Sequence, residues 1–127
     1  MKQYQVIIPA GITPFPEQFE ITAASLLSKF FKSNVEFVKR SSHKTPDFRI
    51  NGVYWELKSP TGSGKHNIQH QLQLASLQSS NIVFDSRRSK IHQSKINHEV
   101  RYQFMIIKRA KRLLLITKNG KVIEINK

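Results

Sequence analysis

Three residues that can do chemistry lie close together in this chain: Asp47, Glu56 and Lys58. Asn51-Gly52 stands between the two acids. Asn-Gly between two runs of alternating apolar and polar residues is the strongest short-range signal of a β-hairpin. A two-residue turn fixes the register, so Asp47 is predicted to lie directly opposite Glu56. Facing carboxylates indicate a bound cation, a shared proton or a contact with a basic group.

Alternation along the two predicted strands separates a polar face from an apolar face. The polar face holds Asp47, Glu56 and Lys58, together with Arg49 and Tyr54. The apolar face is predicted to pack in the core and comprises Phe48, Ile50, Val53, Trp55 and Leu57. Like charges directly opposite each other destabilise a sheet by up to ~1 kcal/mol, so facing acids favour a functional site. The alternative is a solvated strand face on which Arg49 and Lys58 neutralise the acids.

The spacing Pro-Asp, a short gap and then Glu-x-Lys resembles the signature of the PD-(D/E)XK nuclease superfamily. The resemblance implies that Asp47 and Glu56 hold a divalent metal, Mg²⁺ or Mn²⁺, with the carbonyl of Leu57 as an extra ligand. It implies that Lys58 orients or activates the attacking water.

Two predicted helices supply further candidates under the same resemblance. In this superfamily a glutamine on the helix after the Glu-x-Lys strand recurs as a site partner, which here is Gln71 or Gln78. An acid on the helix before the sheet joins the metal site in some members, which here is Glu17 or Glu20. The alternatives are that the glutamines are polar boundary residues and that the two acids complement a helix N-terminus.

A longer segment, residues 41–88, resembles the nuclease domains at the C-termini of contact-dependent growth inhibition toxins, in particular the CdiA C-terminal tRNase type. The resemblance rests on the sequences KTPD, WELKSPTG, LQSSN and NIVFD, the last followed by basic residues. It implies cleavage of RNA, usually tRNA, and in some such toxins catalysis without metal in a barnase-like fold. It also implies a cognate immunity protein, delivery from a larger secreted toxin and action in the cytoplasm.

Composition independently predicts a nucleic-acid partner. The 127 residues contain 21 Lys and Arg against 8 Asp and Glu, a formal net charge of +13, which calls for a polyanion. No run approaches the ~18 apolar residues of a transmembrane helix, and the N-terminus is not a signal peptide, so a membrane is the weaker partner. The chain has no cysteine, which excludes disulfides, a thiol nucleophile and a cysteine-based zinc site.

The loop after Lys58 leads from the proposed site into a helix. It offers Thr61 and Lys65 as phosphate contacts, and His66 as a catalytic acid or base near its ordinary pKa of ~6.5. An ordinary strand-to-helix connection is the alternative. The predicted nucleic-acid contacts are Lys44, Thr61, Lys65, Gln78, Arg87, Arg88, Arg109 and Lys111.

The predicted fold is a single α/β domain over residues 1–127, with a central, mostly antiparallel sheet flanked by helices, PD-(D/E)XK-like or alternatively barnase-like. Helices are expected from about Pro16, over Asn67–Ser79 and from about Lys95. Strands are expected over 4–9, 35–38 and 82–84, in the Asn-Gly hairpin described above, and in a second Asn-Gly hairpin of 112–118 with 121–126.

The predicted function is phosphodiester cleavage, by one of two chemistries. With metal, Asp47 and Glu56 hold the ion and Lys58 supports the nucleophile. Without metal, the 2′-OH of RNA attacks, with Glu56 or His66 as base and Lys58 stabilising the phosphorane. RNA is favoured over DNA by the toxin resemblance alone. A metal-dependent deoxyribonuclease and a non-enzymatic nucleic-acid-binding module are the alternatives.

Overall fold

The structure is a computed structural model that describes residues 3–41 and 45–127. Along the chain the elements are β1 (Val6–Ile7), α1 (Gln18–Phe31), β2 (Val35–Phe37), β3 (Phe48–Ile50), β4 (Val53–Lys58), α2 (Asn67–Ser76), β5 (Asn81–Asp85), α3 (Gln93–Ile106), β6 (Arg112–Ile116) and β7 (Val122–Ile125). The predicted elements are all present, with ends that differ by a few residues.

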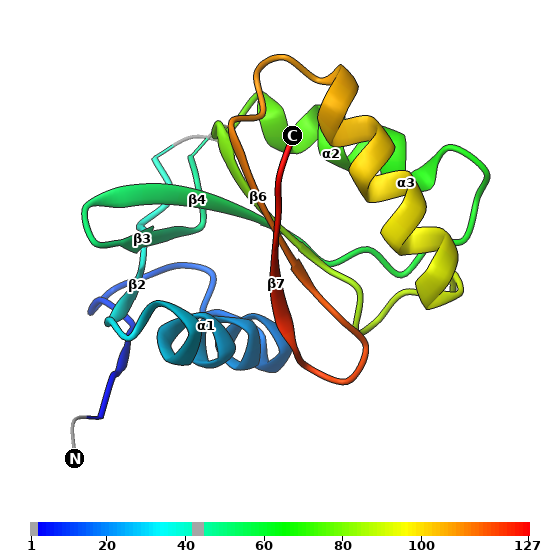
Figure 1. Cartoon of the computed structure of the whole chain (residues 1–127). Helices are drawn as coiled ribbons and strands as arrows, with labels where there is room; N and C mark the ends of the chain where they lie inside the picture. The colour runs from blue at the N-terminus through cyan, green and yellow to red at the C-terminus, as the bar shows by residue number, and fades with distance from the viewer. Residues whose placement is uncertain (1–2, 42–44) are drawn as a thin grey trace.

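The seven strands form one sheet in the order β1 to β7 (Figure 1). The pairs β1–β2, β4–β5 and β5–β6 are parallel, and the pairs β2–β3, β3–β4 and β6–β7 are antiparallel. A single α/β domain is therefore confirmed, but the prediction of a mostly antiparallel sheet is wrong. The sheet is mixed because each of the three helices connects two strands that pair in parallel, the connection that parallel pairing requires.

The helices cover opposite faces of the sheet (Figure 1). α1 buries Ala23, Ala24 and Leu27 against one face, where Trp55 packs against Phe31 with ring centroids 5.5 Å apart. α2 and α3 lie together on the other face. Their buried apolar residues are Ile68, Leu72, Ala75, Ile96, Val100 and Phe104.

The first hairpin has the predicted turn and register. Asn51 and Gly52 both have positive φ, 53° and 77°, as a type I′ turn requires. The strands pair as Phe48–Trp55, Arg49–Tyr54 and Ile50–Val53. Val53 is exposed rather than in the core, because it lies at the hairpin tip.

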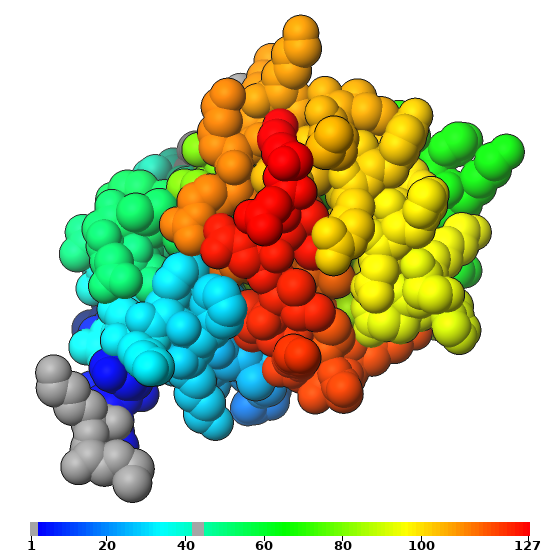
Figure 2. Space-filling model, in the orientation of Figure 1, coloured from blue at the N-terminus to red at the C-terminus, as the bar shows by residue number. Residues whose placement is uncertain are grey.

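The second hairpin closes the chain, with β7 at the edge of the sheet next to β6. Its turn differs from the first, since only Gly120 of the Asn-Gly pair has positive φ, 85°. On the face shown in Figure 2 the C-terminal strand (red) lies between the α1–β2 region (blue to cyan) and α3 (yellow). Over the described residues, none of the helices has the length and apolar character needed to cross a membrane.

Candidate active site

The predicted catalytic residues gather at one edge of the sheet. Lys58 ends β4, and Asp47 directly precedes β3, which runs antiparallel to β4. The start of β3 therefore lies beside the end of β4, which in turn is parallel to β5. The carboxyl ends of parallel strands are where ligand sites form in α/β sheets, so the topology supports the location of the predicted site.

Asp47 lies where the regular pairing of β3 with β4 ends, and both main-chain and side-chain contacts hold it there. Its N–H donates to the carbonyl of Trp55 (3.1 Å), and its Oδ2 accepts the N–H of Leu57 (2.8 Å). Arg40 lies 3.4 Å from its Oδ1. The predicted regular pairing of Asp47 directly opposite Glu56 is therefore wrong, because the Asp47 carboxylate takes a main-chain N–H of β4. The two acids are nevertheless neighbours.

Glu56 is buried although it lies on the polar face of the hairpin, with only 3 % of its surface exposed. Its Oε2 pairs with Lys58, while its Oε1 has no hydrogen-bond partner among the described residues. Burial, and then the negative charge of Asp47, raise the pKa of Glu56 to about 8, against the opposing effect of Lys58. At neutral pH this carboxyl group retains a proton, which Oε1 can carry toward Asp47.

Lys58 connects the acids to helix α2. Its Nζ lies 3.3 Å from Oε2 of Glu56 and donates to Oε1 of Gln78 (3.2 Å). Of the two predicted glutamines, Gln78 thus reaches the site, directly after the C-terminal end of α2. The ammonium group is held between an acid and an amide, which fixes a positive charge beside Glu56.

The donor set fits a hard divalent cation. Glu56 presents a buried carboxylate oxygen that lacks a partner, next to the carboxylate of Asp47. Within the described residues no three His, Cys, Asp or Glu side chains form a metal-binding group. Mg²⁺ commonly binds through one or two carboxylates and completes its shell with waters and substrate phosphate. Asp47 and Glu56 are therefore the residues that would hold such an ion.

A small cavity of about 50 Å³ joins Asp47 to the start of α1. Glu20 and Arg40 are among its lining residues. Glu20 also closes a capping box, in which its Oε1 accepts the N–H of Glu17 (2.9 Å). The helix-capping alternative for Glu20 is thus present in the structure, and the same residue borders the cavity of Asp47.

His66 lies apart from the acids. It precedes α2 and lines an open hollow of about 350 Å³ with Gln69, His70 and Gln73. No hydrogen bond or ion pair between described residues joins His66 to Glu56 or Lys58, so the structure does not bring it into the predicted catalytic group. Thr61 and Lys65 are exposed in the preceding loop. Lys44 lies outside the described residues.

Arg87 and Arg88 both make contacts within the fold, and Arg88 remains exposed. Arg87 forms two hydrogen bonds to the buried Asp85 (2.9 and 2.7 Å) and donates to the carbonyl of Phe19 (2.9 Å). Arg88 donates to Ser59 and lies over the ring of Phe19 at 3.5 Å. The pattern Asp85-Ser86-Arg87 after a buried strand was the available signal for this network, which sequence reasoning missed. Arg40 was missed as well.

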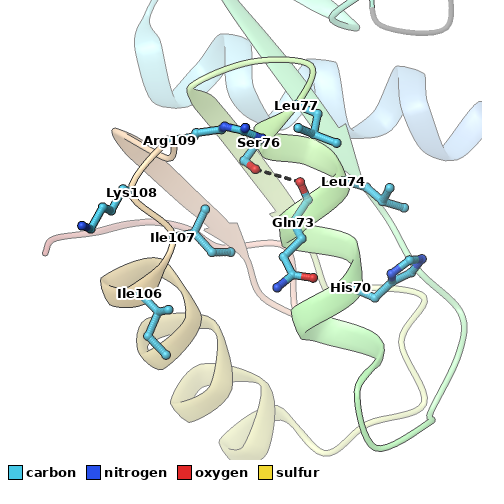
Figure 3. Close-up of a pocket in the computed structure, with 9 residues that line it drawn as sticks. All are labelled: His70, Gln73, Leu74, Ser76, Leu77, Ile106, Ile107, Lys108 and Arg109. Atoms are coloured by element: carbon cyan, nitrogen blue, oxygen red, sulfur yellow. Dashed lines mark hydrogen bonds between the residues drawn. The ribbon is translucent and has the colours of Figure 1, made fainter.

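Arg109 and Lys111 are exposed, as predicted, but belong to another part of the surface. Arg109 borders a groove of about 590 Å³ between the ends of α2 and α3. Figure 3 shows Leu74 of α2 and Leu77, which directly follows that helix, on one side and Ile106 with Ile107 on the other. Of the predicted catalytic residues, none lines this groove.

Comparison with known proteins places the chain among bacterial toxin domains. The family model described as "Contact-dependent growth inhibition CdiA C-terminal domain" matches residues 44–122. The structure is similar to a chain of the "CdiA-CT/CdiI toxin and immunity complex from Burkholderia pseudomallei", with a TM-score of 0.69 and 21 % sequence identity. The similarity covers 98 % of this chain and 100 % of that one. No curated protein matches the chain.

Proposed function

Because the chain belongs to the contact-dependent growth inhibition CdiA C-terminal domain family, a family of toxin domains, we propose that it is a nuclease that cleaves RNA, with tRNA as the preferred substrate. The observation that carries the proposal is the buried Glu56, which lies beside Asp47 and pairs with Lys58. A fold has no structural need for such an arrangement, since burial and the charge of Asp47 both disfavour the ionised form of Glu56. The choice of tRNA rests on the resemblance to tRNase toxins.

In the proposed reaction an oxygen nucleophile attacks the phosphorus in line with the leaving oxygen, and the phosphodiester bond opposite to it breaks. Lys58 places its positive charge where negative charge develops on the phosphate oxygens. Glu56 can accept the proton of the nucleophile in its ionised form, which becomes the main form as the pH rises past its pKa of about 8. Gln78 positions Lys58 through its contact with Nζ.

Asp47 and Glu56 would hold Mg²⁺ or Mn²⁺. When bound, such an ion stabilises the charge on the phosphate and lowers the pKa of an attacking water. Asp47 would bind the ion without a change of position, because its Oδ2 already accepts the N–H of Leu57. If the reaction instead uses the 2′-OH of RNA, the same Glu56 and Lys58 act as base and charge stabiliser.

Purified protein is incubated with tRNA and with duplex DNA in Mg²⁺, Mn²⁺ or EDTA. We expect tRNA cleavage that Glu56→Gln and Lys58→Ala each abolish, with folding and nucleic-acid binding retained. Glu124→Gln is the matched control, since this exposed carboxylate pairs with Arg112 on β6 and β7, away from the candidate site. Cleavage that survives EDTA would assign the 2′-OH route. Near-wild-type turnover by either site variant would refute the catalytic assignment, and binding without cleavage would assign a non-enzymatic module.

The proposed setting follows from family membership. The related Burkholderia pseudomallei toxin was solved with an immunity protein, and we propose that a cognate immunity protein also binds this chain. We further propose that the domain is delivered from a larger secreted toxin and acts in the cytoplasm of the target cell. The toxin without its partner should stop growth when expressed, and Lys58→Ala should remove that effect.

A further inference from the structure

The sheet face that carries Glu56 and Lys58 is covered over only part of its width. The apolar cluster under α2 and α3 draws its sheet residues from β5, β6 and β7. Among the described residues it contains none from β1, β2 or β3. The start of β4 and its neighbours therefore keep an open face directly beside the candidate site.

One row of side chains crosses this open face. The strand register pairs Glu36 with Arg49 and Arg49 with Tyr54, so the three residues lie side by side on β2, β3 and β4. Arg49 and Glu36 form an ion pair at 3.3 Å. Tyr54 is 47 % exposed, so its ring is an open aromatic surface beside a charged pair.

Tyr54 lies two residues before Glu56 on the same face of β4. Two residues of a strand span about 6.6 Å, which is comparable to the span of one nucleotide. The main chain at Tyr54 is fixed, because its carbonyl accepts hydrogen bonds from Ser79 (2.9 Å) and Asn81 (3.1 Å). The backbone from which the ring projects is therefore fixed two residues from the buried acid.

From this geometry we propose that Tyr54 is the stacking platform for an unstacked base of the nucleic-acid substrate, adjacent to the phosphate that is cleaved. The proposal rests on the proposed function. Proteins that bind single-stranded nucleic acid stack bases on exposed aromatic rings, and the net charge of +13 favours a polyanion. Because every base has a π-face, the platform would select an unpaired nucleotide rather than a particular base.

A protein partner fits this face less well. Protein interfaces are centred on contiguous apolar patches, whereas Tyr54 stands next to the Arg49–Glu36 ion pair. Five other exposed apolar side chains lie on or directly after α2 and α3: Leu74, Leu77, Tyr102, Met105 and Ile106.

The test measures binding in a Lys58→Ala background, so that the probe is not cleaved. The probes are a short labelled single-stranded RNA, the same RNA with one abasic residue placed at each position in turn, and the DNA of the same sequence. We expect Tyr54→Ala to weaken binding of intact RNA and DNA by about tenfold or more, and Tyr54→Phe to retain it. The loss should disappear with the RNA that is abasic at the stacked position.

Tyr102→Ala is the matched control, because Tyr102 is 55 % exposed on α3. Equal affinity of Tyr54→Ala and Tyr102→Ala would overturn the proposal, and so would a loss of the same size with every abasic probe. In the first case the open face would be assigned to a protein partner. The proposed nuclease activity is tested separately, since an abasic-dependent loss would support the platform even if no substrate were cleaved.

Discussion

Glu56 is the residue whose environment differs most from that of an ordinary side chain. It is buried, it shares Lys58 with Gln78, and its second oxygen lacks a partner among the described residues. A proton and a divalent cation compete for such an oxygen, because each neutralises the charge that burial disfavours. We therefore expect metal binding to release a proton and to strengthen as the pH rises toward about 8.

The free energy of unfolding should fall with rising pH because of Glu56. Its folded-state pKa of about 8 exceeds its ordinary value of 4.5. Between these values the folded state holds a proton that the unfolded state releases, so stability is lost as the pH rises through this window. Glu56→Gln removes the effect, and without metal should exceed the wild type at about pH 9 by about 1–3 kcal/mol. Denaturant unfolding across pH is the measurement, and parallel curves for the two proteins would contradict it.

Asp47 has two separable roles, which two substitutions distinguish. Asp47→Asn keeps an oxygen that can accept the N–H of Leu57 but removes the charge beside Glu56. Without metal it should match or exceed wild-type stability above neutral pH, by up to about 1 kcal/mol. Asp47→Ala leaves the N–H of Leu57 without its acceptor and should destabilise by about 1–3 kcal/mol. Equal destabilisation by both variants would show that the ion pair between the Asp47 carboxylate and Arg40, rather than the hydrogen bond to Leu57, stabilises the fold.

At the scale of elements, a second polar network joins β5 to α1. Asp85 is fully buried at the end of β5 and pairs with Arg87, which also donates to the carbonyl of Phe19 near the start of α1. Ser59, which follows β4, donates to the same carboxylate (3.2 Å). The network thus fixes the ends of β4 and β5 relative to α1, and with them the edge at which Lys58 lies.

Asp85→Ala should destabilise the protein by about 3–5 kcal/mol, because it leaves the guanidinium of Arg87 without its partner in a largely buried position. Glu124→Ala is the matched control, since both members of its pair with Arg112 are about 40 % exposed. It should cost about 0–1 kcal/mol. Thermal and denaturant unfolding of the two variants make the comparison, and a similar small effect for both would show that the buried pair contributes little.

The sequence predicts the elements whose signals are local. The Asn51-Gly52 turn gives the hairpin register correctly because the turn and its flanking strands are adjacent in the chain. Glu56 was placed on the correct face, but its burial was not predicted. It becomes buried because β4 pairs in parallel with β5 and α2 crosses between them, a long-range arrangement that alternation along one strand cannot report. The internal contacts of Arg87 were not predicted for the same reason, since one of them is with the carbonyl of Phe19.

At the scale of the whole molecule, positive charge greatly exceeds negative charge on this chain. Several acids are already engaged in ion pairs, including Glu36, Asp47, Asp85 and Glu124. The surplus cations are therefore available to an external polyanion. Composition alone predicted such a partner, but it could not assign the positions, since Arg87 is used internally whereas Arg109 and Lys111 are exposed.

Binding to RNA should therefore weaken steeply with salt. If six or more phosphates are engaged, affinity should fall by about 10³-fold or more between about 50 and 200 mM salt. Reversing the charges of Arg109 and Lys111 should reduce the slope of log affinity against log salt by the amount expected for the loss of about two phosphate contacts. The matched control reverses Lys29 and Lys32 at the end of α1, on the opposite face of the sheet, and should leave the slope near the wild-type value.

Lys58→Ala should change the salt slope by one phosphate contact at most, because this side chain is proposed to contact a single phosphate. Equal flattening by both pairs would indicate nonspecific attraction to the whole surface, and an affinity that ignores salt would point to a partner other than nucleic acid.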